Sequence, residues 1–301
     1  MNIFIDALEA VEPFEETDPP PDEQPRPELA FVPQSCAARG WDRSEPEPRR
    51  WVIQDVLPVG RVGGLFGAGG AGKSRLIGSA AVSIASGVQW LGFPVIEPGA
   101  VLIVAGEDEA EEFHRRIRLA INHLPQDRQK LAWDRIFFES RIGQDSLLTT
   151  TNPASREVER TAFLDRLIEA AKLIPDLRLI VLDPLSRFRG GDENASQDIT
   201  RIVEAAEHLA KETGAAVLLV HHIGKSAALG GNDSQHAARG SSALVDGMRF
   251  AWNLGPLAPA DIKRFALSED RAPNPLTNCA SSSWLFLMIK VCEARFVILS
   301  S

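Results

Sequence analysis

The 301-residue sequence is poor in cysteine, has no long apolar run and lacks a basic N-terminal segment. The three cysteines, Cys36, Cys279 and Cys292, do not have the spacing of metal ligands and cannot form a disulfide framework. Such sparse use of cysteine suits a reducing compartment. No apolar run approaches the roughly 20 residues of a membrane-spanning helix, and the acidic N-terminus is unlike a secretory signal. We therefore expect a cytoplasmic protein with no membrane partner.

Positive charge is also scarce, because the net charge is −9 at neutral pH. Most of this excess lies in residues 1–34, where nine acidic residues accompany a single base, Arg26, and the remainder of the chain is close to neutral. A near-neutral body still has room for local basic loops. Net charge therefore does not decide whether nucleic acid is a partner.

The acidic segment also contains several prolines and few large apolar residues. A segment of this composition cannot bury enough apolar surface to offset its loss of conformational entropy. We therefore predict that residues 1–34 are a disordered, acidic, proline-rich tail. Residues 35–50 are predicted to be a lead-in segment, and residues 51–301 a folded domain whose pattern diverges beyond about residue 255.

A glycine-rich loop is the clearest motif, because Gly67 to Ser74 matches G-x-x-x-x-G-K-[ST] at every fixed position. This is the pattern of a phosphate-binding P-loop, in which glycines let backbone N–H groups converge on phosphate oxygens. An apolar run precedes the loop, and an expected helix over 73–87 adds the positive potential of its N-terminus. We predict that Lys73 reaches the β- and γ-phosphates and that Ser74 binds Mg²⁺. The predicted nucleotide-binding residues are Gly67, Ala68, Gly69, Gly70, Ala71, Gly72, Lys73, Ser74 and Arg75.

Apolar runs of strand length alternate with helical patterns after the P-loop. Continuous apolar runs are typical of parallel strands that are covered on both faces. The alternation predicts an α/β fold with a mostly parallel, doubly wound sheet and helices on both faces. Ligands of such sheets bind at the carboxyl ends of the strands. We expect strands at 99–106, 136–138, 177–183, 215–222 and 248–253 and one or two more within 281–299, helices at 160–173 and 196–213, and a loop at 143–156.

Acidic side chains follow two of the expected strands. Asp183 ends an apolar strand, which is the place of a carboxylate that orients Mg²⁺. Glu107 follows the apolar run 101–105, where a carboxylate is placed to activate a water for attack on the γ-phosphate. Asp108 and Glu109 compete for that role, and all three acids also suit the start of a helix. We favour Glu107 because it comes first after the strand.

A histidine pair and an arginine complete the set of candidates. His221 and His222 end a strand and are placed to sense the γ-phosphate or a bound strand, and we favour His222. Zinc is not expected, because no cysteine or further histidine has ligand spacing. Arg239, which is flanked by glycine and serine residues, is a candidate arginine finger for the phosphates of a neighbouring subunit. An ordinary surface charge is the alternative for Arg239.

The order of six motifs over about residues 41–252 resembles the RecA/DnaB-like P-loop ATPases, and among them the plasmid RepA-type hexameric replicative helicases. The motifs are GAGGAGKS, AGED, LIVLDPLSR, GGDENAS, VLLVHHIGKS and AARGSSALVDGMRF. The resemblance implies a RecA-like ATPase domain over residues 51–301, with ATP and Mg²⁺ as cofactors. It also implies a homo-oligomeric ring, expected to be a hexamer, that acts on single-stranded DNA as a helicase of plasmid, phage or mobile-element type. The acidic tail would then be a contact for a replication partner.

The resemblance also implies roles for individual residues. The family's loops after the strands of Asp183 and His222 face a central channel, and Arg187, Arg189 and Lys225 are therefore predicted to contact the backbone of a single strand. Ordinary loop charges are the alternative for these three residues. The other implied roles are phosphate and Mg²⁺ binding by Lys73 and Ser74, water activation by Glu107, metal binding by Asp183, phosphate sensing by His222 and action in trans by Arg239.

The C-terminal part departs from this family. Where the family usually has a strand ending in Ser-Lys and then Asn-Tyr-Gly, this chain has Ser268-Glu269-Asp270-Arg271, and it contains no tyrosine. An acidic pair in place of a basic contact weakens the case for DNA translocation but leaves nucleotide hydrolysis untouched. The alternative function is a nucleotide-switched regulatory or loader ATPase that assembles and binds partners without unwinding DNA. A small-molecule kinase is disfavoured, because Glu107 is placed to activate water.

Overall fold

The computed structural model describes residues 30, 37–39, 41–152, 154–155, 157–190, 196–222, 242–256, 285–291 and 294–300. The chain divides into two compact units, Met1–Pro48 and Arg49–Ser301. In the first unit, the described residues include one turn of 3-10 helix, η2 (Trp41–Arg43), with no buried side chain. Almost all of the predicted tail at 1–34, together with Lys225 and Arg239, lies outside the described residues.

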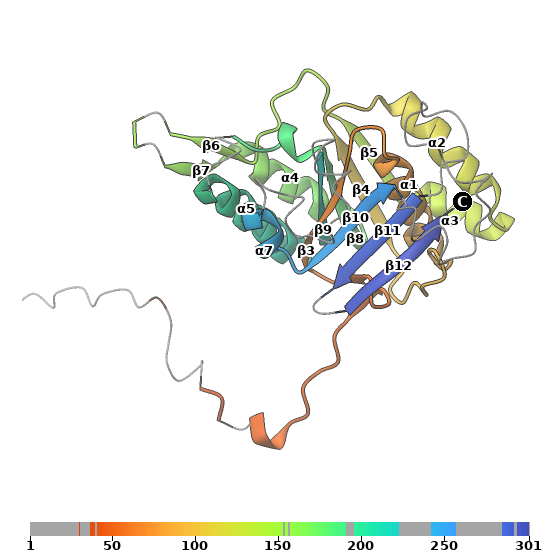
Figure 1. The fold of residues 1–301 in the computed structure, drawn as a ribbon, viewed down its shortest axis with the longest axis horizontal. Helices are drawn as coiled ribbons and strands as arrows, with labels where there is room; N and C mark the ends of the chain where they lie inside the picture. The colour runs from red at the N-terminus through yellow and green to blue at the C-terminus, as the bar shows by residue number, and fades with distance from the viewer. Residues whose placement is uncertain are drawn as a thin grey trace, which may run out of the picture. The chain divides into compact units, whose positions relative to one another are not determined.

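A single large sheet runs through the second unit (Figure 1). In the described part of the chain its strands are β3 (Val62–Gly67), β4 (Ala100–Ala105), β5 (Ile136–Ser140), β8 (Leu177–Asp183), β9 (Ala216–His222), β10 (Phe250–Pro256), β11 (Leu285–Val291) and β12 (Ala294–Ser300). The order across the sheet is β12-β11-β10-β3-β9-β8-β4-β5. The strands from β10 to β5 pair in parallel, and β11 pairs antiparallel with both β10 and β12. This confirms the predicted α/β fold with a mostly parallel sheet, and the strands expected after residue 281.

The central parallel strands are mostly apolar because both of their faces are covered. Every residue of β3 and of β4 is buried. Successive side chains of a strand point to opposite faces, so Val101 and Ile103 of β4 pack into one core and Leu102 and Val104 into the other. Full burial of side chains of this size contributes about 1.5–3 kcal/mol each. A polar substitution in the middle of β4 would therefore disrupt the packing of one of the two cores.

Helices cover each face of the sheet (Figure 1). The core on one face includes side chains from α1 (Lys73–Ser86), α2 (Ala110–Asn122) and α3 (Gln126–Arg135). The core on the other face includes side chains from α4 (Ala162–Lys172), α5 (Ser196–Thr213) and α7 (Ser242–Asp246). The predicted helices on both faces are thus confirmed. Within the described residues, no helix is both long enough and apolar enough to cross a membrane.

Two small hairpins lie outside the main sheet. β1 (Trp51–Ile53) pairs with β2 (Leu57–Pro58), and β6 (Thr149–Thr151) pairs with β7 (Val158–Arg160). The β6–β7 hairpin, at the left of Figure 1, shows that the expectation of a loop over 143–156 was wrong for residues 149–151. Threonine favours strands because its branched side chain suits a pleated surface. The hairpin also meets the segment that follows β8.

Candidate nucleotide-binding site

The P-loop joins β3 to α1 and is shaped by its glycines. Gly70 and Gly72 have φ angles of 77° and 93°, which residues with a side chain rarely adopt. Gly67 is confined by β10, since an added Cβ would lie 2.9 Å from the carbonyl oxygen of Leu254. Gly72 caps α1 without a side-chain hydrogen bond, so the helix N-terminus presents its backbone N–H groups to the loop. This cradle fits phosphate oxygens.

Lys73 is the first residue of α1 and is only 5% exposed. Its Nζ donates hydrogen bonds to the carbonyl oxygens of Gly67 at 2.8 Å and Ala68 at 2.9 Å. The same nitrogen lies 3.0 Å from Nδ1 of His222, so a protonated Lys73 makes Nδ1 the acceptor and leaves the ring hydrogen on Nε2. Burial lowers the pKa of Lys73, although nearby carboxylates act in the opposite direction. A poorly solvated cation at this position favours an anionic ligand.

Asp183, the last residue of β8, lies opposite Ser74 of α1. The Ser74 hydroxyl donates to Oδ2 of Asp183 over 3.5 Å. Burial raises the pKa of Asp183 to about 6, the charge of Asp108 adds to this, and the charge of Lys73 opposes it. Hydroxyl and carboxylate oxygens are ligands that Mg²⁺ prefers, usually together with water and phosphate oxygens. The described residues contain no cluster of three or more His, Cys, Asp or Glu side chains suited to a metal ion. The oxygens of Ser74 and Asp183 fit a Mg²⁺ whose other ligands come from nucleotide and water.

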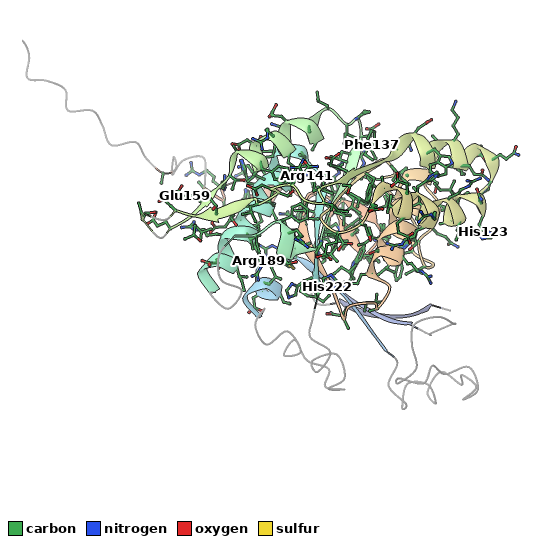
Figure 2. All side chains as sticks on the ribbon, turned by 90° about the horizontal axis from the view of Figure 1, so that it is seen from above. His123, Phe137, Arg141, Glu159, Arg189 and His222 are labelled. Atoms are coloured by element: carbon green, nitrogen blue, oxygen red, sulfur yellow. The ribbon has the colours of Figure 1, made fainter. Side chains whose placement is uncertain are left out.

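The structure brings His222, rather than His221, to the P-loop. His222 is labelled in Figure 2. β9 lies beside β3, and its register places His222 opposite Gly67. The ring of His221 instead approaches Phe66 edge to face, with 6.1 Å between the centroids. Partial burial of the ring, followed by the charge of Lys73, lowers the pKa of His222. At neutral pH a neutral His222 is thus a hydrogen-bonding group beside Lys73 rather than a second cation.

The three acidic residues that follow β4 have different surroundings. Glu107 accepts a hydrogen bond at Oε1 from Nε of Arg187 over 3.2 Å. Asp108 accepts at Oδ2 from Nη1 of Arg116 on α2 over 2.8 Å. Glu109 occupies the position before the first residue of α2. Asp108 and Glu109 are therefore engaged with α2, whereas Glu107 faces the segment that follows β8.

The carboxyl ends of four neighbouring strands bring most of the predicted site together. β3 leads to Lys73, β9 ends at His222, β8 ends at Asp183 and β4 leads to Glu107. The charge of Glu107 acts on the pKa of Lys73, Asp183 and His222, and the charge of Asp108 acts more strongly than that of Glu107 on the pKa of Asp183. Both carboxylates therefore act on the site electrostatically. Arg189, also shown in Figure 2, pairs through its backbone with Thr149 of β6.

Some contributions to the site were not predicted from the sequence. Leu254 limits residue 67 to glycine from a strand that is remote in sequence. Arg116 of α2 pairs with Asp108. The only local signal for this arginine is its i,i+4 spacing from Glu112, with which it also forms an ion pair at 3.0 Å. The pairing of Glu107 with Arg187 had no sequence signal.

The strand order and the P-loop together define the class of protein. β9 separates the P-loop strand β3 from β8, the strand that ends at Asp183, and this arrangement with its flanking helices is a RecA-like P-loop core. A family model described as an AAA domain matches residues 26–228, which is more than half of the chain. The chain belongs to this AAA domain family and is a P-loop ATPase.

Two solved structures are similar in fold. The ATPase domain of G40P is 11% identical, with 80% of this chain and 79% of that chain covered and a TM-score of 0.47. A structure described as a DnaB-like replicative helicase and its interactions with primase is also 11% identical, with a TM-score of 0.48. That match covers 80% of this chain and 55% of the other. Similarity at this level carries no conclusion about activity.

Proposed function

We propose that the protein is an ATP-hydrolysing, ring-forming motor on single-stranded DNA, of the RepA-like replicative helicase type. The observation that carries the hydrolytic part is the convergence of Lys73, Asp183, His222 and Glu107 at the ends of four adjacent strands. A phosphate-binding cation, a metal-binding carboxylate, a sensor and a base are the parts that phosphoryl transfer to water requires. The ring and the DNA are supported by the order of the sequence motifs.

Nucleotide binding follows from the P-loop and its two partners. The backbone N–H groups of the loop and Nζ of Lys73 hold the phosphate oxygens, and Lys73 exchanges its carbonyl contacts for phosphate contacts. The Ser74 hydroxyl and the Asp183 carboxylate hold Mg²⁺, which when bound supplies positive charge to the phosphate oxygens. A deprotonated Asp183 is needed for this, and at neutral pH it is mostly charged because its pKa is about 6.

Hydrolysis is assigned to Glu107. Its carboxylate takes a proton from the attacking water, while Asp108 is held by Arg116 and Glu109 begins α2. His222 contacts Lys73 directly and lies on the strand between the P-loop and Asp183, so it senses whether the γ-phosphate is present. Arg239 is assigned to the phosphates of a neighbouring subunit, which is why the site would be completed only in a ring.

The DNA contacts are assigned to Arg187, Arg189 and Lys225. The first two follow β8 directly, so they emerge from the same sheet edge as the ATPase residues. This proximity supports a route by which a bound strand acts on hydrolysis. The second candidate function, a regulatory or loader ATPase that does not unwind DNA, is favoured by the acidic Glu269-Asp270 pair and by the acidic N-terminal segment.

The test is ATP turnover with and without single-stranded DNA, run beside unwinding of a forked duplex. The motor hypothesis predicts DNA-stimulated turnover and unwinding. Nucleotide-dependent assembly without a response to DNA would contradict it and support the loader function. For the base, Glu107→Gln should lower turnover about 100-fold or more while nucleotide binding is kept. The matched variant Asp108→Asn should keep most of its turnover, and the reverse result would reassign the base to Asp108.

A further inference from the structure

An ion pair connects the proposed base to the proposed DNA-contact segment. Nε of Arg187 lies 3.2 Å from Oε1 of Glu107, across 80 positions of sequence. Both side chains are accessible, with 59% of Arg187 and 49% of Glu107 exposed. The carboxylate assigned to water activation is thus held by a cation that a polyanion can reach from solvent.

The segment that carries Arg187 is fixed by its neighbours. Leu185 and Phe188 are 1% and 0% exposed, and they anchor the chain on either side of Arg187. The backbone of Phe188 accepts a hydrogen bond from Leu148 at 2.7 Å, and the backbone of Gly190 donates to Thr149 at 2.9 Å. Arg187 is therefore an exposed side chain on an anchored stretch of chain, so its stem keeps its place when its guanidinium changes partner.

Because Gly106 has no side chain, the stem of Arg187 can cross the end of β4, which leads to Glu107. A Cβ added to Gly106 would lie 2.6 Å from Cγ and 2.7 Å from Cβ of Arg187. Contacts this short are not tolerated between real side chains, so the stem of Arg187 lies directly over the backbone of Gly106. Packing as well as charge therefore directs the guanidinium to Glu107.

We propose that Arg187 is a positioning residue that restrains Glu107, and that a phosphodiester of a bound single strand releases it. A carboxylate oxygen that accepts a hydrogen bond from a guanidinium is directed toward that group and is less free to accept from a water. Phosphate oxygens compete for the same N–H donors, because guanidinium binds phosphate and carboxylate in the same way. When a phosphate of the bound strand accepts from Arg187, the carboxylate of Glu107 is free to accept the proton of the attacking water. This inference rests on the proposed function of the site.

The size of the effect is bounded by the exposure of the pair. An accessible ion pair biases two arrangements by no more than about fivefold. Restraint by Arg187 should therefore lower strand-free turnover by about two- to fivefold, which sets a low basal rate without abolishing hydrolysis. The bias should also weaken with salt, since charges at the surface are screened.

The first experiment needs no DNA. Steady-state ATP turnover of Arg187→Ala should exceed that of the wild type about two- to fivefold at low ionic strength, and the difference should close as salt is raised. Arg187→Lys, which keeps the charge but loses the fork, should fall between the two. The control is Arg201→Ala, because Arg201 forms a similarly exposed pair with Glu204 on α5, at 2.9 Å and with 58% and 43% exposure. Basal turnover of Arg187→Ala at or below that of the wild type would overturn the restraint.

The second experiment adds saturating oligothymidylate. Wild-type turnover should be stimulated, and Arg187→Ala should show at most a small further rise because Glu107 is already released. An unchanged fold-stimulation of Arg187→Ala at saturation would make Arg187 a DNA contact only and overturn the release step. If the wild type itself does not respond to the strand, the proposed motor function fails, while the restraint stands or falls on the first experiment.

Discussion

Asp183→Asn should make the protein more stable while removing its Mg²⁺-dependent turnover. The structure raises the pKa of Asp183 from 3.8 to about 6, chiefly by burial. The charged carboxylate is therefore disfavoured in the folded state relative to the unfolded chain. An amide keeps the shape of the side chain without the charge, so the variant should be relieved of that penalty.

The magnitude follows from the shift. A shift of about 2 units corresponds to about 3 kcal/mol at most, since one unit is about 1.4 kcal/mol. The folded protein binds more protons than the unfolded chain between pH 3.8 and about 6, so this carboxylate lowers stability as pH rises through that interval and the loss is complete above it. The gain in the variant should therefore be about 3 kcal/mol near pH 8 and about half of that near pH 5.

The assay is thermal or urea unfolding at these two pH values, with a chelator and without nucleotide. A gain of about 3 kcal/mol corresponds to a midpoint roughly 6–12 °C higher for a domain of this size. Asp134→Asn, at an exposed position on α3, is the matched control and should change stability by no more than about 0.5 kcal/mol. A variant that is no more stable than the wild type near pH 8, or whose gain does not shrink near pH 5, would refute the reasoning.

Two further predictions concern packing and assembly. Gly63→Ala on β3 would place a Cβ 2.5 Å from the ring of Phe250, so it should cost about 1–3 kcal/mol of unfolding free energy. Gly255→Ala, where an added Cβ meets nothing within 4 Å, is the control, and equal urea midpoints for the two variants would contradict the prediction. Mixing Lys73→Ala subunits with Arg239→Ala subunits should restore part of the ATP turnover, whereas a mixture as inactive as either parent would exclude action of Arg239 in trans.

The fold was predictable because its signals are local. The parallel strands β4 and β9 contain continuous apolar runs, and β8 and β9 end at polar residues, Asp183 and the histidine pair. A run that must be buried on both faces tolerates no polar residue, so its end is legible in the sequence. The P-loop is equally local, since its glycines and Lys73 lie within one short stretch.

The choice between neighbouring residues was not predictable in the same way. The position of Glu107 or Asp108 in the sequence does not reveal that Arg187 meets the first and Arg116 the second. The β6 strand was missed because the polar composition of its segment is typical of a loop. Nothing in that segment indicates its pairing with β7. Ion pairs and strand pairings of this kind depend on which residues tertiary packing brings together. They produce no periodic pattern in the sequence of either partner.

A shared electrostatic condition ties the site residues to one another. Burial is the leading cause of the lowered pKa of Lys73, of the lowered pKa of His222 and of the raised pKa of Asp183, so the site disfavours charge of either sign. Poor solvation also strengthens the attraction of Lys73 for a phosphate and of Asp183 for a divalent cation. The same burial thus lowers the stability of the protein through its charged groups and strengthens their binding to a ligand. Asp183→Asn separates these two effects, because the variant gains stability and loses affinity for the divalent cation.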